Sequence, residues 1–188
     1  MNARFVRNAF VLLIVLGGFF LFGLIRPFDR DDQVQIGDHT VTSHRAKVVE
    51  GGKEDTRNVV VRPSPEFLIE YAFGDGQQGF NILRIEADGT GQYSFWDEAA
   101  ESNRQKTLTF ELSPDDLEAI CGKVNQSGFM ALANEYRGDV TDGTQIAITV
   151  VTGHVEKEVF CDNHFPVAVV TVADYLEKEV IQPNRNNS

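Results

Sequence analysis

The feature that most constrains this chain is an uninterrupted apolar segment near its start, residues 9–25, which begins at Ala9 and ends at Ile25. The segment carries no charged residue, and as a helix it would be about 26 Å long at 1.5 Å per residue. That length approaches the ~30 Å hydrocarbon core of a bilayer. A helix that is apolar on every side belongs in a protein core or in a membrane. We therefore predict a single transmembrane anchor within residues 1–26.

A cleaved signal peptide is the alternative interpretation, because Arg4 and Arg7 precede the apolar run. The run exceeds the usual apolar core of about 7–15 residues, and no small-residue cleavage site follows it, which favours an uncleaved anchor. Arg26 and Arg30 follow the run, so the contrast in basic residues across it is small. The short basic start still resembles the cytoplasmic tail of a signal anchor. We expect a single-pass protein of the cell membrane with the bulk of the chain on the extracytoplasmic side.

The charge of the chain is strongly acidic, with 17 Lys and Arg against 28 Asp and Glu and a formal net charge of −11. Such a chain repels the phosphates of nucleic acids and anionic lipid headgroups. We therefore expect no nucleic-acid partner. The acidity is sufficiently explained by solubility, with binding of a cation or a basic partner as the second interpretation.

The remainder of the chain is predicted to form a stalk, one folded domain and a tail. Residues 27–65 are predicted as a stalk or linker, with a small hairpin over residues 33–42 that turns at Gly37 and Asp38. The folded domain is expected over residues 66–182, and the polar residues 183–188 are expected to fray. The part outside the membrane is long enough for one domain with a real core.

Alternating apolar residues and turn signals predict six strands in this domain. Turns at Asp88-Gly89 and around Gly153 would close two hairpins, because glycine supplies the positive φ of tight turns. The predicted strands are residues 67–73, 80–86, 91–96, 107–112, 146–151 and 155–160.

Two helices complete the predicted domain. Ser113 precedes Pro114, and Asp116 follows three residues after the serine, which is the pattern of a capped helix start. Gly128 would end this helix, and a second helix is expected from about residue 167 to Ile181. The order ββββαββα predicts an α+β fold, an antiparallel sheet of about six strands packed by two helices.

The run GDGQQG, from Gly74 to Gly79, matches the letters of the dinucleotide-binding fingerprint. That fingerprint requires a helix directly after the glycines, whose amide groups hold the pyrophosphate. Here the pattern predicts a strand instead, so these glycines are interpreted as turn residues and no cofactor is expected.

Cys121 and Cys161 are the two cysteines of the chain. Both fall on predicted apolar faces. A disulfide between them would close a loop of about 40 residues and contribute roughly 3–4 kcal/mol in the chain-entropy model. The alternative is two unpaired core cysteines that behave as small hydrophobic residues.

Two stretches are weak candidates for catalysis or metal binding. Cys161 and His164 stand at metal-like spacing, and Asp139 and Asp142 flank a predicted turn. A zinc site needs three or four ligands, and a calcium loop needs more regularly spaced acids and a later glutamate. We therefore predict no metal, no cofactor and no catalytic residues.

Five runs carry a resemblance to a known family: ILRIEADGTGQYSF, LSPDDLEAI, GFMALANEY, TQIAITV and, after a turn, VEKEVF. Over roughly residues 80–181 the chain resembles a family of bacterial exported or membrane-anchored α+β domains of unknown function. The resemblance implies the same order of elements and an envelope location. It carries no catalytic residues to this chain.

These observations together predict a membrane-anchored extracytoplasmic binding or interaction module without catalysis, whose partners are the bilayer and a membrane or envelope protein. One alternative is an accessory single-pass subunit of a larger membrane complex. A second is an envelope hydrolase that uses Asp139 and Asp142 or the loop from Cys161 to His164.

Overall fold

The computed structural model of the protein describes residues 32–44, 46–49, 55–75, 77–97, 104–140 and 143–186. Asp31–Ser188 form one compact unit. The predicted anchor, Ala9 to Ile25, lies outside the described residues. Within the described ranges, no helix is both long and apolar enough to cross a membrane.

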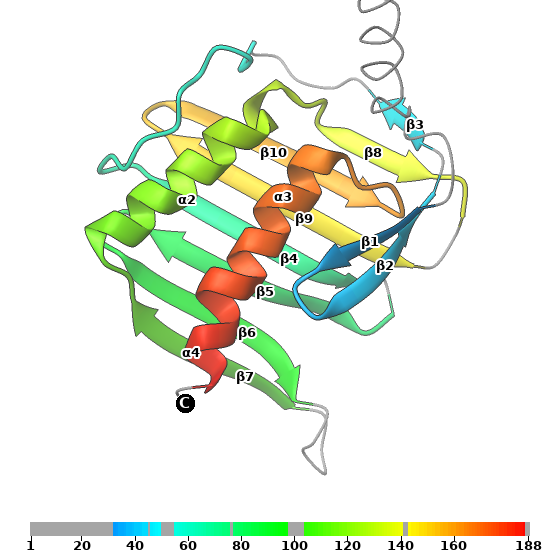
Figure 1. Ribbon diagram of the computed structural model, residues 1–188. Coiled ribbons are helices and arrows are strands. Elements are labelled where there is room, and N and C mark those ends of the chain that lie inside the picture. Colours follow the sequence, from blue (N-terminus) through cyan, green and yellow to red (C-terminus); the bar gives the residue numbers. More distant parts are fainter. Residues whose placement is uncertain are drawn as a thin grey trace, which may run out of the picture. The chain divides into compact units, whose positions relative to one another are not determined.

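Eight strands form the main sheet, in the order β3-β8-β10-β9-β4-β5-β6-β7 (Figure 1). β8 and β10 pair in parallel, and every other neighbouring pair is antiparallel. The strands are β3 (Ala46–Val49), β4 (Leu68–Asp75), β5 (Gly79–Glu86), β6 (Thr90–Asp97), β7 (Arg104–Glu111), β8 (Glu135–Gly138), β9 (Thr144–Thr152) and β10 (Val155–Asp162).

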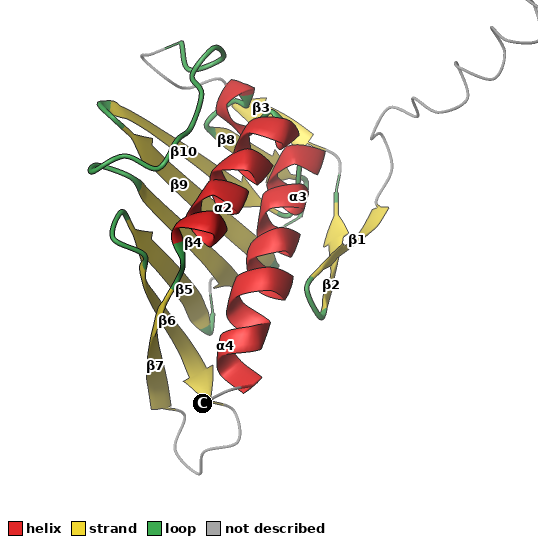
Figure 2. Cartoon of the chain, turned by 60° about the vertical axis from the view of Figure 1, so that its left-hand side comes forward, coloured by secondary structure: helices red, strands yellow, loops and turns green. Residues whose placement is uncertain are grey.

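Helices cover one face of this sheet, and none of the described helices lies on the other, which we call the open face (Figure 2). The first is α2 (Pro114–Ser127), which is followed by the single turn η1 (Phe129–Ala131). The second helical segment is continuous and consists of α3 (Val167–Tyr175), the π-helical η2 (Leu176–Ile181) and α4 (Gln182–Asn186). The predicted α+β class, with a largely antiparallel sheet and two packing helices, is confirmed.

Strand alternation explains which face the helices cover. Ile69 and Tyr71 of β4 are buried, as are Leu83 of β5 and Ile148 of β9. Because side chains alternate across a strand, these residues line the helix-covered face, and their sequence neighbours face the open side.

The cap predicted for α2 is also confirmed: the Ser113 hydroxyl accepts a hydrogen bond from the Asp116 amide, and the Asp116 carboxylate accepts one from the Ser113 amide at 2.9 Å.

The predicted stalk is wrong for the residues that the structure describes. The predicted hairpin exists as β1 (Asp32–Ile36) and β2 (His39–Ser43), paired with each other. Yet it belongs to the folded unit, because Ile36 and Val41 are buried in the core and the amide of Gly37 donates to Asp174 of α3 at 3.0 Å. The hairpin has only two buried apolar residues, and polar residues surround them in the sequence. For that reason the segment resembles a linker.

The segment before β4 is likewise held to the domain. The side chain of Asn125 in α2 accepts the amide of Val61 and donates to its carbonyl, both at 2.8 Å. Thr56 is buried, and its hydroxyl donates to the carbonyl of Met130 at 2.5 Å. Residues 55–67 therefore pack against the domain and do not form a stalk.

Two further expectations are corrected. No strand is predicted at residues 135–138, yet β8 lies there and joins the sheet through parallel backbone pairing with β10. β3 is not predicted either and pairs with β8, so the sheet has eight strands and not six. The tail expected to fray contains α4, and its Arg185 guanidinium lies 4.8 Å from the centre of the Phe95 ring. A cation–π contact of this kind orders a polar segment that has no apolar face.

Two glycines, one inside α2 and one at its C-cap, provide a test of the helix and its end. Gly128 has φ of 76° at the C-cap, and a Cβ at either Gly122 or Gly128 would meet nothing within 4 Å. Gly128→Ala should destabilise the domain by about 1 kcal/mol, because alanine disfavours positive φ. Gly122→Ala should stabilise it by about 0.5–1 kcal/mol, because it removes a glycine from a helix interior.

Chemical denaturation of both variants measures the two effects on the free energy of unfolding. Since neither methyl group meets a neighbour, opposite signs are expected. Equal signs would contradict the assigned helix end.

Candidate functional site

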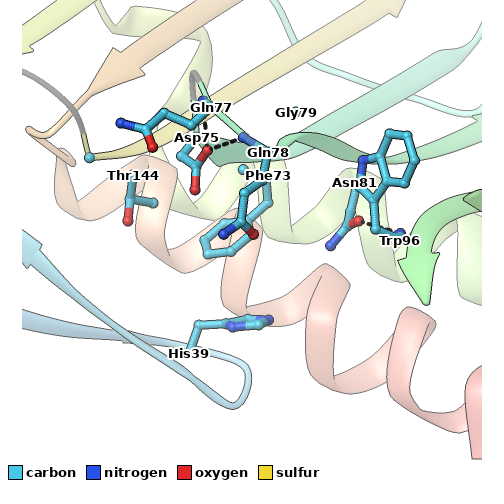
Figure 3. A pocket seen from close by; sticks show the side chains of 11 residues that line it. His39, Phe73, Asp75, Gln77, Gln78, Gly79, Asn81, Trp96 and Thr144 are labelled. Atoms are coloured by element: carbon cyan, nitrogen blue, oxygen red, sulfur yellow. Dashed lines mark hydrogen bonds between the residues drawn. The ribbon is translucent and has the colours of Figure 1, made fainter. Parts of the chain in front are cut away.

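A cavity with a volume of about 480 Å³ lies at one end of the central strands (Figure 3). It is bounded by the turn that joins β4 to β5, by the start of β9 and by His39 at the tip of the β1–β2 hairpin. A volume in the range of about 300–1,000 Å³ is typical of small-molecule sites.

The turn between β4 and β5 is fixed by its own hydrogen bonds. Asp75 Oδ1 accepts the backbone amides of Gln77 at 2.8 Å and Gln78 at 2.6 Å. A Cβ on Gly74 would lie 2.1 Å from the Gly79 carbonyl, so only glycine allows this close approach. β5 follows the turn directly, which confirms the prediction that these glycines serve a hairpin instead of the dinucleotide-binding fingerprint.

Trp96, the single tryptophan of the chain, stands on one side of the cavity and is 36% exposed. The backbone pairing of β5 with β6 ends at Ile82 and Ser94. Beyond that point the backbone amide of Trp96 donates to Asn81 Oδ1 at 3.1 Å. A side chain thus replaces the backbone partner and holds the strand that carries the indole.

On another side of the cavity, His39 and Phe73 lie ring to ring, with centroids 4.6 Å apart and planes inclined by 30°. This contact joins the β1–β2 hairpin to β4 and makes the hairpin part of the cavity wall. Of the described residues that line the cavity, none is Lys or Arg, and Asp75 is the single carboxylate. The cavity therefore offers neutral polar groups and aromatic surface, with little charge.

The structure does not bring the sequence-predicted candidates to this cavity. Cys161 is fully buried in the hydrophobic core, and burial raises the pKa of its thiol well above the ordinary value. His164, three residues later, is also buried. Its Nδ1 lies 2.6 Å from the His44 carbonyl oxygen, and its ring is stacked on Tyr136. A nucleophilic cysteine needs a lowered pKa, so this pair has the opposite character.

Of the two candidate aspartates, the structure describes one. Asp139 is exposed just after β8, and Asp142 lies outside the described residues. Over the described ranges there is no group of three or more His, Cys, Asp or Glu side chains that could hold a metal ion.

The two cysteines are free thiols in the structure, and both are buried. Burial raises the pKa of Cys121 to about 11. Of the two alternatives in the sequence, the structure has the unpaired core cysteines.

A thiol assay on the full-length chain tests this state. Neither cysteine should react with an aromatic disulfide reagent in the native protein, because both are buried and protonated near neutral pH. Both should react in denaturant without prior reduction. A requirement for reduction before labelling would show a Cys121–Cys161 disulfide.

A carboxyl group, that of Glu177, is buried beneath the β1–β2 hairpin. Glu177 of η2 is 5% exposed, and its Oε1 accepts the hydroxyl of Tyr71 at 3.1 Å. Burial raises the pKa of Glu177; the Tyr71 hydrogen bond and Arg185 oppose the shift, whereas Asp38 and Asp174 add to it. π-Helical turns occur frequently at functional sites, but this carboxyl is enclosed by protein.

The raised pKa of Glu177 makes a pH-dependent prediction for stability. The folded state binds the proton of the Glu177 carboxyl more tightly than the unfolded chain does. The free energy of unfolding is therefore least reduced by Glu177 below the ordinary glutamate pKa of about 4.3. This reduction grows as pH rises through the higher folded-state pKa. Glu177→Gln keeps an acceptor for Tyr71 and removes the charge, so its advantage in unfolding free energy should grow between pH 4 and pH 8.

Glu179→Gln is the control, because it makes the same chemical change at an exposed position of the same helical turn. Denaturant titrations at several pH values give the three curves. A Glu177→Gln advantage that is constant with pH would contradict the raised pKa.

Comparison of the sequence with known proteins finds no matching family model and no significantly similar curated protein. The resemblance to exported bacterial domains therefore stays a prediction.

Proposed function

We propose that this chain is a membrane-anchored binding module without catalysis, with the domain on the extracytoplasmic side and the cavity beside Trp96 as its recognition site. Support for the anchor comes from the apolar run that ends at Ile25 and from the basic residues before it. The recognition site rests on one observation: the cavity at the strand ends gathers an exposed tryptophan and several uncharged hydrogen-bonding side chains.

The way the cavity is built supports recognition. Five strands of the described part contribute to its lining, β2, β4, β5, β6 and β9, and Gln77 and Gln78 come from the β4–β5 turn, whose amides are held by Asp75. Strands hold side chains more rigidly than free loops do, so the groups are already in place before a ligand arrives. The thiol and imidazole proposed for an envelope hydrolase are instead buried away from this cavity.

Ligand-induced stabilisation of the full-length chain in nanodiscs tests the proposal. A small-molecule and glycan extract of the cell envelope should raise the midpoint of thermal unfolding by about 5–10 °C at ligand concentrations about a hundredfold above Kd. Trp96→Ala should abolish this rise. Ile82→Ala is the matched control, because Ile82 is also 36% exposed on a neighbouring strand but does not line the cavity.

Each outcome has a defined meaning. No rise for the natural chain, or an equal rise for all three proteins, would contradict a binding site at this cavity. If the protein instead purifies in mild detergent in constant ratio with other membrane proteins and no extract stabilises it, the accessory-subunit alternative is supported.

A further inference from the structure

The chemistry of the cavity walls restricts the kind of ligand that fits. Anionic ligands such as phosphates or carboxylates need cationic partners or several converging amide groups. Among the described residues that line the cavity there is no Lys or Arg, and the one basic side chain is His39, whose ring packs against Phe73. The carboxylate of Asp75 adds a negative charge, and the amides of Gln77 and Gln78 already donate to it. An anion is therefore disfavoured.

Cationic ligands are not well matched either. Recognition of an ammonium group uses several open aromatic faces together. The rings of Phe73 and His39 lie against each other and so each covers one face of the other, while Trp96 is 36% exposed. One oxygen of the single carboxylate, Asp75 Oδ1, is engaged by the turn.

The remaining groups suit hydroxyls. The carboxamides of Gln77 and Gln78 are exposed, and within the described part of the chain neither has a hydrogen-bond partner. Asn81 uses its Oδ1 for the Trp96 amide, so its Nδ2 is left as a donor that faces the cavity. A carboxamide donates and accepts, as a hydroxyl does, and the hydroxyl of Thr144 does the same.

Trp96 supplies what such a polar wall lacks. A sugar ring carries hydroxyls around its edge and C–H groups on its faces, so it combines hydrogen bonding with an apolar surface. The exposed indole offers a large apolar face beside the carboxamide of Asn81 (Figure 3). The backbone that carries it is held by the bond from the Trp96 amide to Asn81 Oδ1.

From these contacts we propose that the cavity binds a neutral saccharide, with one sugar ring stacked on Trp96 and its hydroxyls bonded to the carboxamides of Gln77, Gln78 and Asn81. This assignment rests on the proposed function, since it names the ligand class of the same cavity. A carbohydrate is also a ligand class that a domain outside the cytoplasm would meet in an envelope.

Trp96 allows a direct test, because it is the single tryptophan and its fluorescence reports on this cavity alone. The full-length chain in nanodiscs is titrated with cellohexaose, maltohexaose and chitohexaose as neutral probes. Hexagalacturonate serves as the anionic probe and choline as the cationic one. At least one neutral probe should change the Trp96 emission saturably, and the charged probes should bind about tenfold more weakly or not at all.

Variants locate the binding. Gln78→Ala should weaken the neutral probe about tenfold, and it is expected to fold because the amide of Gln78, and not its side chain, holds the turn. Ile82→Ala should leave the affinity unchanged. Calorimetry with Trp96→Phe, which has no fluorescent indole, should show a loss of about tenfold in affinity.

The outcomes separate this inference from the proposed function. If no neutral probe binds but the envelope extract still stabilises the chain in a Trp96-dependent way, the saccharide assignment is overturned and the binding module stands. If neither the probes nor the extract has an effect, both fail. Equal affinity for the charged and neutral probes, or loss of binding in Ile82→Ala, would also overturn the assignment.

Discussion

The structure depends on the packing of two helical segments against one face of the sheet. The central strands β4, β5 and β9 bury Ile69, Leu83 and Ile148 completely on that face. Each such side chain contributes roughly 1.5–3 kcal/mol relative to exposure, so the alternation of these strands decides which face is covered. The opposite face carries exposed ion pairs such as Arg84 with Glu70, which contribute little to stability.

One-sided packing also determines where a binding site forms. The cavity lies at the ends of β4 and β5, where the strands close in a turn and the β1–β2 hairpin stands beside them. The hairpin is tied down twice, by the amide of Gly37 to Asp174 and by His39 against Phe73. The first segment that the structure describes is therefore also a wall of the proposed site.

Local pattern predicted much of this fold but not its assembly. The capped start at Ser113 and the turn glycines follow from short-range chemistry, so they were readable from the sequence. β8 pairs through its backbone and has almost no apolar signal, and α4 is ordered by a tertiary contact of Arg185. Trp96 and His39 come together with the β4–β5 turn only through strand order and hairpin docking, which a single sequence does not show. Composition marked Trp96 as unique, but not as exposed.

The central claim is that this chain recognises its ligand at the cavity beside Trp96. Hydrogen–deuterium exchange of the full-length chain in nanodiscs, with and without envelope extract, tests it most directly, because bound ligand slows exchange of the amides it covers. The account predicts added protection at Gln77, Gln78 and Trp96, with little change in α2. Added protection only at amides away from the cavity, or no added protection at all, would contradict this claim.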